Sequence, residues 1–567
     1  MNNLTLADCG KDLSSIIKNI DVFPIVKYYI EQLEIHNIIN NAIPTAPQSE
    51  ISTAQILCIM ISNIVIAKHP LYKIEQWVAK YFDGRAEVET ESNLYNDDKC
   101  ARALDKLYSA DRNTLLTQIS AKAIEIHQLE LKQINNDSTS ISFAGNYDNN
   151  DGNQDSVKLT YGFSKDNKPD CKQVVFGLST TSDGHVPIKY ELFDGNKTDD
   201  TTHVNTWDSL RTFIKTTDFV YIADSKLCTA NNINHIASNG GKFITIMPRN
   251  RKEVTEFYKQ LSDGGAVKWQ DEYNVPSARK KGEFTQYKFH EGKPTADGYR
   301  IIWVHSNNKD KQDKDTRNRR IQKTLEQLEE LQPRLNKHKL KTHTQIETEC
   351  NKINKHGFIA ININEHKTTH RKQTKRGKPT ADTQYIETEE KTYTIDWNKD
   401  DNAILQDSYT DGIFPLISNV DETMTQILQR YKTQPFLEKR FQTSKSVLNI
   451  APVFLKKPHR IEAMMFLYFI ALMIVSLLER NIRKQLKQTP QELRILPNKR
   501  HTNSPTWSNI KEFFSDVYLN ILKYKRESLA RLCGLSDLHE LVLTLLKVPI
   551  QVYSNLQNNW WQFNLTG

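Results

Sequence analysis

The stretch "YKTQPFLEKRFQTSK", residues 431–445, carries the spacing on which the interpretation of this chain depends. Its polar residues Tyr431, Gln434, Glu438 and Lys445 are separated by intervals of three, four and seven. Each residue of an α-helix turns the chain by about 100°, so the four side chains are predicted to lie along one stripe. A polar stripe with one acid and a terminal lysine indicates a site that faces a ligand.

Pro435 leaves two alternatives open for this stripe. A proline inside a helix removes an N–H and clashes with the carbonyl four residues earlier, so the helix would kink. Alternatively, the helix begins here with Pro435 in its first turn, where a proline is tolerated. In that case the argument for one stripe through Tyr431 and Gln434 is weaker.

Glu438 lies at a boundary on the predicted helix. Leu437 and Phe441 are expected to face the core, whereas Lys439 and Arg440 are expected to turn toward solvent or a ligand. Taken alone, Glu438 is most simply a surface glutamate in an ion pair, which contributes little to stability. It indicates chemistry only in combination with other acids.

Length and charge set broad limits. A chain of 567 residues is too long for one ordinary core, and two to four domains are expected. The balance of 76 Lys and Arg against 68 Asp and Glu gives a net charge of +8, which fits a polyanionic partner but also fits an ordinary basic protein. A mean hydropathy of −0.61 with 25% charged residues is typical of a soluble protein.

No targeting or membrane segment is predicted. The uncharged apolar run 463–478 is shorter than the roughly 20 residues of a membrane span, so a buried core helix is expected. The first residues lack the pattern of a secretory signal. The seven cysteines are scattered without a CxxC pair, which is typical of reduced thiols in an intracellular protein. We therefore expect a cytoplasmic protein.

The pattern along the chain predicts a mixed α/β core inside helical regions. Residues 1–125 have helical periodicity. Short segments rich in β-branched and aromatic residues then predict strands. These segments are 140–145, 157–164, 172–181, 186–195, 218–225 and 242–248. Helices between the later strands indicate a mixed sheet.

A charged region interrupts this core. Heptad-like leucines predict a helical segment that ends near Pro333, and the basic stretch 365–384 is expected to be a mobile loop. Strand character returns at 391–396 and 412–419, and the remainder is expected to be helical. The predicted domains are 1–125 (helical), 126–250 (first part of the core), 251–408 (insertion), 409–480 (second part of the core) and 481–567 (helical).

Two further acids stand at predicted strands. Asp224 closes the apolar run "FVYIAD", at the end of a strand where α/β sheets bind ligands, and is either a helix cap or a site residue. Asp137 precedes "STSISF" at the margin of the core, although a lone Asp more often forms a turn. Together with Glu438, these carboxylates could hold two magnesium ions about 3.5–4 Å apart. Magnesium prefers oxygen ligands and needs neither His nor Cys.

With these motifs in place, the sequence resembles the DDE transposases of bacterial insertion sequences. It is most similar to the insertion-sequence-four-like superfamily, whose signature is Y-(2)-R-(3)-E-(6)-K. Here the signature residues are Tyr431, Gln434, Glu438 and Lys445, with the spacing intact. The segments "NNDSTSISF" (135–143), "VYIADSKLCTANNI" (220–233) and the stretch 440–474 resemble the family's surroundings of the acids.

The resemblance implies an RNase H-like α/β fold, in which a strand-rich charged insertion separates the second acid from the third. It implies magnesium-dependent hydrolysis at the ends of the element, with two Mg²⁺ ions or Mn²⁺ in their place. The freed 3′-OH then attacks target DNA. Implied partners are double-stranded DNA, as terminal inverted repeats and target, and a second copy of the chain in a homodimer. A cytoplasmic, nucleoid-associated location follows.

By the same resemblance, Asp137, Asp224 and Glu438 would be the catalytic metal ligands. Tyr431, Gln434, Lys445, Lys439 and Arg440 are the residues expected to contact DNA. Gln434 departs from the arginine of the family and brings no charge. Asn196 and Asp199 would lie near the site, although turn chemistry explains them equally well.

Two other functions remain open. One is a DNA-binding derivative of a transposase with an inactive centre, and the other is a structure-directed nuclease of the same fold. Inverted repeats beside the gene would separate a transposase from such a nuclease, because only the transposase requires them.

Overall fold

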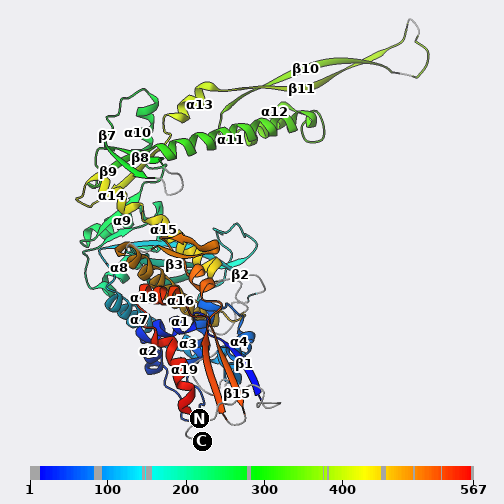
Figure 1. The fold of residues 1–567 in the computed structure, drawn as a ribbon. Coiled ribbons are helices and arrows are strands. Elements are labelled where there is room, and N and C mark those ends of the chain that lie inside the picture. The colour runs from blue at the N-terminus through cyan, green and yellow to red at the C-terminus, as the bar shows by residue number, and fades with distance from the viewer. Residues whose placement is uncertain are drawn as a thin grey trace. The chain divides into compact units, whose positions relative to one another are not determined.

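The structure, a computed structural model, describes residues 13–81, 92–143, 147, 156–276, 282–374, 376–379, 382–448, 455–489, 492–524 and 527–563 (Figure 1). The chain folds as two units, Met1–Thr245 with Gln429–Gly567 (unit 1) and Ile246–Leu428 (unit 2). The predicted insertion, 251–408, lies inside unit 2. Residues 409–428, predicted as core, also belong to unit 2, and the predicted terminal regions share unit 1 with most of the core.

A mixed sheet organises unit 1, in the order β4-β3-β2-β5-β6. Its strands are β2 (Gln133–Phe143), β3 (Lys172–Thr181), β4 (Pro187–Asp194), β5 (Val220–Ile222) and β6 (Lys242–Ile246). The first three strands are antiparallel neighbours, whereas β5 runs parallel to β2 and β6 parallel to β5. The parallel steps need crossovers, and α8 (His203–Ile214) and α9 (Ala230–Ser238) provide them. The predicted mixed α/β class is confirmed.

The strand predicted at 157–164 is wrong. This segment makes one isolated antiparallel bridge, between Thr160 and Gln173. The side-chain amide of Gln173 instead donates to the carbonyls of Phe163 at 3.1 Å and Gly195 at 2.8 Å. A side chain therefore satisfies carbonyls that a strand ladder would have used, which β propensity alone could not indicate.

Helix α16 (Pro458–Gln488) is the central core helix of unit 1. It is long and apolar enough to cross a membrane, but 94% of its most apolar stretch is buried in the fold. The core helix predicted at 463–478 is thus confirmed. The N-terminal helices that share unit 1 with it are α1 (Phe23–Gln32), α2 (Ile35–Ala42), α3 (Thr53–Ile66), α4 (Ile74–Lys80), α6 (Asp97–Ser109) and α7 (Arg112–His127).

The prediction that the C-terminal region is helical throughout is wrong. Strand β15 (Tyr518–Tyr524) pairs with β16 (Glu527–Cys533) and also with β1 (Leu13–Asn19). The partner β1 lies about 500 residues away in sequence, so no local pattern could reveal the sheet. The other elements here are β13 (Leu493–Leu496), β14 (Arg500–Thr502), α17 (Trp507–Phe513), α18 (Asp537–Leu546) and α19 (Gln551–Phe563).

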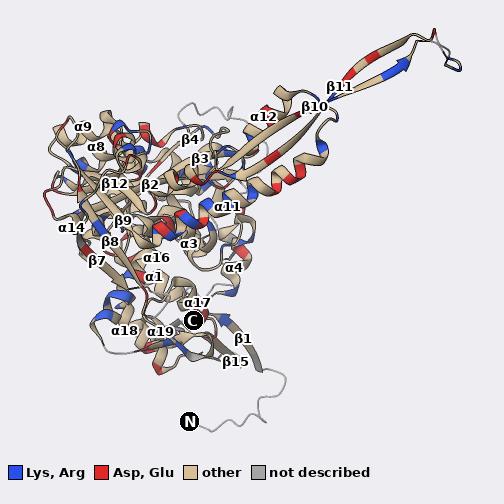
Figure 2. Cartoon of the chain, turned by 90° about the horizontal axis from the view of Figure 1, so that it is seen from above, with Lys and Arg blue, Asp and Glu red and all other residues tan. Residues whose placement is uncertain are grey.

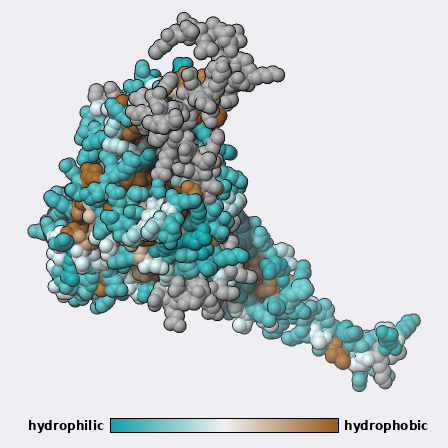
Figure 3. Space-filling model, turned by 90° about the horizontal axis from the view of Figure 1, so that it is seen from below, coloured by the Kyte–Doolittle hydropathy of each residue, from teal (hydrophilic) through white to brown (hydrophobic). Residues whose placement is uncertain are grey.

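The face drawn in Figure 3 is largely hydrophilic, with apolar side chains in small groups.

Unit 2 contains an antiparallel sheet and an extended hairpin. The sheet order is β12-β9-β8-β7, formed by β12 (Ile413–Ser418), β9 (Arg300–Ser306), β8 (Phe284–Glu291) and β7 (Gln270–Pro276). Its helices are α10 (Lys252–Ser262), α11 (Asn307–Leu331), α12 (His343–Ile353) and α13 (Asp401–Ser408), and α14 (Met424–Tyr431) crosses the boundary between the units. The predicted helix end near Pro333 is confirmed, because α11 stops at Leu331.

The first part of the basic stretch predicted as a mobile loop, 365–373, lies in a strand, whereas 374–384 connects this strand to the next and includes positions 375 and 380–381 outside the described residues. Strands β10 (Ile359–Gln373) and β11 (Tyr385–Lys399) pair along their whole length, and Figure 2 shows charged residues along both. Cross-strand charge pairs support the register, with Arg371 3.7 Å from Glu387 and His370 3.0 Å from Glu390. Alternating charged and β-branched residues thus form strands that a count of apolar residues overlooks.

Candidate active site

Asp137 lies on β2, and Asp224 follows the end of its neighbour β5 in unit 1. Strands β2 and β5 are parallel, and Asn135 stands opposite Ile222. Asp137 and Asp224 lie two residues beyond this last pair, and the charge of Asp224 acts on Asp137. The carboxylate of Asp224 also accepts the backbone N–H of Lys226 at 3.0 Å, capping the short 3₁₀ turn that follows. Asp224 is therefore both a cap and a neighbour of Asp137.

Burial and like charge act on both acids. The pKa of Asp137 is raised to about 7: burial raises it most, the charges of Asp224 and Asp199 also raise it, and the ammonium of Lys165 and the backbone N–H of Ser138 lower it. Burial likewise raises the pKa of Asp224, with a further contribution from Asp199. Both carboxylates are half-buried, and half-buried carboxylates that repel one another are stabilised by a cation between them. The pair is therefore a candidate cation site.

Two further residues, Asp199 and Lys165, lie beside these acids. Asp199 accepts a hydrogen bond from the hydroxyl of Ser138, directly beside Asp137. Lys165 places its Nζ 3.0 Å from Asp199 Oδ2 and 3.7 Å from Asp137 Oδ1. Asp199 was expected only from the family resemblance, and Lys165 was missed. It lies on a loop with no local signal, and only the strand pairing shows its position.

Glu438 lies at an exposed position on helix α15 (Gln434–Gln442). Helix α14 ends at Tyr431, and α15 starts with Pro435 in its first turn, so the second alternative for this proline is confirmed. The pKa of Tyr431 is raised by burial and then by the charges of Asp224, Asp137 and Glu438. The charges of all three carboxylates thus act on Tyr431, although within the described part of the chain no three acids are grouped closely enough to hold a metal.

Gln434 connects α15 to the acid-bearing strand. Its side-chain N–H donates to the carbonyl of Asn136 at 2.8 Å, and its oxygen accepts from Asn135 at 3.0 Å. The side chain is buried, so the amide positions the helix beside β2. Lys445 lies on the π-helical turn Thr443–Val447 and contacts both carboxylate oxygens of Asp166 at 2.7 Å. Such turns are frequent at functional sites.

The two basic residues after Glu438 differ in exposure. Lys439 is exposed and lies 4.6 Å from the ring centre of Phe436. Arg440 is buried, and its guanidinium donates to the carbonyl of Gly184 and to Glu479, both at 2.7 Å. Successive helical residues differ by about 100°, which is enough to send Arg440 inward. The expectation that Arg440 faces solvent or a ligand is wrong, and its role here is structural.

The raised pKa of Asp137 predicts a pH dependence of stability in metal-free protein. The folded state keeps this proton up to about pH 7, whereas the unfolded chain releases it near 3.8. The folded state binds more protons in this window, so the free energy of unfolding should fall as pH rises through it, by up to about 1.4 kcal/mol per pH unit. Urea denaturation between pH 4 and 7 measures this slope.

Asp137→Asn should flatten the slope, because asparagine does not titrate. Asp170→Asn, at an exposed position on the loop before β3, should leave it unchanged. Equal slopes in wild type and Asp137→Asn would contradict the assigned environment of Asp137.

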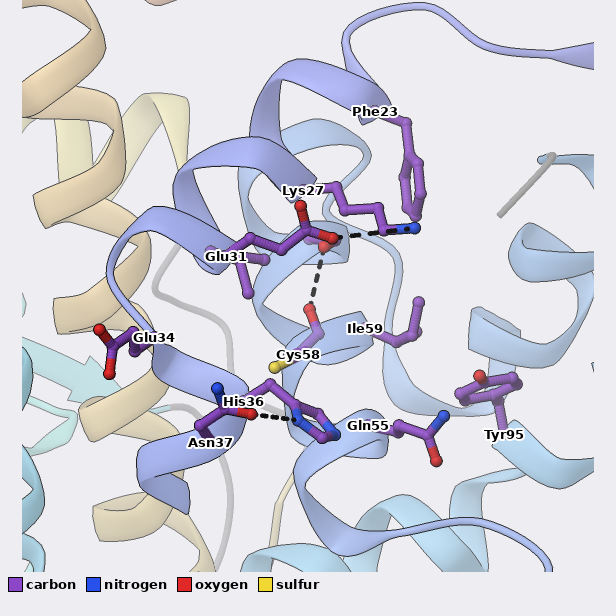
Figure 4. A pocket seen from close by; sticks show the side chains of 12 residues that line it. Phe23, Lys27, Glu31, Glu34, His36, Asn37, Gln55, Cys58, Ile59 and Tyr95 are labelled. Atoms are coloured by element: carbon purple, nitrogen blue, oxygen red, sulfur yellow. Dashed lines mark hydrogen bonds and ion pairs between the residues drawn. The ribbon is translucent and has the colours of Figure 1, made fainter. Parts of the chain in front are cut away.

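A separate pocket of about 430 Å³ lies among the N-terminal helices (Figure 4). Its lining includes Lys27 and Glu31, an exposed pair 4.0 Å apart, and the Cys58 thiol, whose pKa burial raises to about 12. A thiol that stays protonated is a poor nucleophile. This pocket is therefore a weaker candidate for chemistry than the acidic group.

Comparisons with known proteins give one domain match and a distant structural likeness. Residues 15–121 match the family described as a domain of unknown function, DUF4277. No curated protein matches the chain. Among solved structures, the cryo-EM structure of the piggyBac transposase synaptic complex with hairpin DNA is similar, with 9% sequence identity and a TM-score of 0.37. That match covers 96% of this chain and 87% of the other. A TM-score this low carries no inference about function.

Proposed function

We propose that this protein is a DNA transposase of the DDE class, with an RNase H-like core. It would cleave the ends of its insertion sequence by magnesium-dependent hydrolysis and join the 3′-OH ends to target DNA. The observation that supports the proposal is the proximity of two predicted acids: Asp137 lies on β2, Asp224 follows the parallel neighbour β5, and the charge of Asp224 raises the pKa of Asp137.

The residues of the acidic group fit divalent magnesium. Magnesium is commonly held by one or two carboxylates, with water and phosphate as the remaining ligands. Asp137 and Asp224 offer half-buried carboxylates with raised pKa values, so a cation would relieve their repulsion. Within the described part of the chain, no three His, Cys, Asp or Glu side chains are grouped closely enough to hold a metal by themselves. Phosphate oxygens of DNA and water would therefore complete the coordination, and Glu438 is proposed as the third protein ligand.

When bound, the metal would polarise the scissile phosphodiester and favour deprotonation of the attacking water or 3′-OH. The protein's own residues would position the DNA. Tyr431 lies beside the acids and can donate its hydroxyl proton to a phosphate oxygen. Lys445 and the exposed Lys439 offer point charges for the backbone. Gln434 would act indirectly, by fixing α15 against β2.

The partners follow from this chemistry. Double-stranded DNA would supply both the terminal inverted repeats and the target, and two copies of the chain would join two ends. A homodimer associated with the nucleoid in the cytoplasm is the corresponding assembly. Manganese is expected to replace magnesium, because it accepts the same oxygen ligands.

The test is cleavage of a plasmid that carries the gene's own flanking DNA, with and without Mg²⁺. Cuts at fixed flanking positions that require Mg²⁺ are the expected result. Binding without cutting would favour the inactive DNA-binding derivative. Cutting without fixed ends would favour the structure-directed nuclease.

A further inference from the structure

The loop segment Phe163–Lys168 lies against the acid-bearing strand. The backbone N–H of Lys165 donates to the Ser140 hydroxyl of β2 at 2.9 Å. The carbonyl of Phe163 accepts from Gln173 of β3 at 3.1 Å. These contacts attach the segment, here called the strap, to both strands. The consecutive residues Lys165 and Asp166 carry opposite charges, and each engages a different part of the site.

Lys165 lies beside the acids that are proposed to hold the divalent cation. Its Nζ lies 3.7 Å from Asp137 Oδ1, 3.0 Å from Asp199 Oδ2 and 2.7 Å from the carbonyl of Ser138. A lysine ammonium is a compact point charge on a flexible stem. It therefore neutralises the acids where a divalent cation would otherwise do so. About a third of the side chain is exposed, 35%, so it has a path away from the acids.

Asp166 lies against Lys445, the residue proposed to contact a DNA phosphate. Both of its carboxylate oxygens lie 2.7 Å from the Nζ of Lys445, and the two side chains are 34% and 26% exposed. A carboxylate held by a lysine in this way presents the same single negative charge and the same kind of accepting oxygens as a backbone phosphate. Asp166 therefore takes the place that a DNA phosphate would take on Lys445.

We propose that the strap is an internal stand-in for both ligands of the site, with Lys165 in place of the metal and Asp166 in place of a DNA phosphate. This inference rests on the proposed function. Metal and DNA must each exchange with one ion pair of the same short segment. Release of one pair loosens the segment that holds the other, so metal and DNA are expected to bind cooperatively.

The exchange predicts gains of affinity, which a merely structural role of the strap would not give. Lys165→Met keeps the length of the side chain but removes its charge, and should tighten Mn²⁺ binding without DNA by about threefold to tenfold. Asp166→Asn should tighten binding of duplex DNA in EDTA by a similar factor, about threefold to tenfold. Freed Lys445 should also steepen the dependence of log K on log salt by about one ion.

The measurements are Mn²⁺ titration by calorimetry and DNA binding by fluorescence anisotropy, on the full chain. Lys168→Met and Asp170→Asn, at exposed positions of the same loop, are the matched controls and should leave both affinities unchanged. Thermal unfolding verifies that each variant is folded. If wild type binds both ligands but Lys165→Met and Asp166→Asn show unchanged or weaker affinities, the inference about the strap is wrong and the proposed function still stands. A wild type and variants that bind neither ligand would overturn the proposed function and the strap with it.

Discussion

Asp224→Asn is expected to slow DNA cleavage by about a thousandfold, since a charge aimed at the transition state is worth roughly 4 kcal/mol. Asparagine keeps an oxygen that can accept the N–H of Lys226, so the 3₁₀ turn after β5 should persist. It cannot supply the negative charge that a divalent cation requires. Binding of the element ends should remain, because Tyr431, Lys439 and Lys445 are untouched. Single-turnover cleavage and gel-shift binding of the same DNA measure the two effects.

Asp218→Asn is the matched control at the other end of β5. Its carboxylate is 77% exposed and pairs with Lys242 at 3.0 Å, away from the acidic group, so cleavage should stay at the wild-type level. Glu438→Gln should reproduce the loss seen in Asp224→Asn. Wild-type cleavage in either Asp224→Asn or Glu438→Gln would contradict its assignment as a metal ligand.

Arg440→Met is expected to lower the free energy of unfolding by about 3 kcal/mol, the lower end of the usual cost of breaking a buried pair, because Glu479 keeps Arg483 at 3.2 Å as a second partner. Arg440 and Glu479 are 6% and 8% exposed, and the guanidinium also holds the carbonyls of Gly184 and His185. All of these acceptors would lose a donor at once. Urea denaturation followed by circular dichroism measures the change.

Lys439→Met separates stability from DNA binding at the neighbouring position. Lys439 is exposed, with a contact to the ring of Phe436 that is worth about 0.5–1 kcal/mol at such sites. This variant should therefore unfold almost as wild type does but bind DNA more weakly, because the proposed phosphate contact of Lys439 would be lost. A variant Arg440→Met as stable as wild type would contradict the structural role given to Arg440.

Strands and acids of the core could be predicted because their signals are local. The apolar run before Asp224 and the β-branched run after Asp137 each predict a strand from a few neighbouring residues. Their meeting could not be derived that way, since it depends on the parallel register of β2 and β5. The family resemblance connected the acids, and the pairing of β2 with β5 shows why Asp137 and Asp224 lie near one another.

The positions that sequence could not give depend on long-range contacts. Lys165 reaches the acids because Gln173 and Ser140 hold its loop, and neither contact leaves a pattern in sequence. Gln434 looks like a weakened DNA ligand until its amide is seen to bind β2. Strand β15 pairs with β1 across nearly the whole chain. The burial of Arg440 depends on Glu479, which lies one helix further along.

The central claim is that Asp137, Asp224 and Glu438 share one metal site, and local cleavage by bound iron tests it most directly. Fe²⁺ in place of Mg²⁺, with ascorbate and peroxide, cuts the polypeptide beside the bound metal. With DNA ends present, we expect fragments that end near all three acids, are suppressed by excess Mg²⁺ and are absent in Asp224→Asn. Fragments elsewhere in the chain, or fragments that persist in Asp224→Asn, would contradict the account.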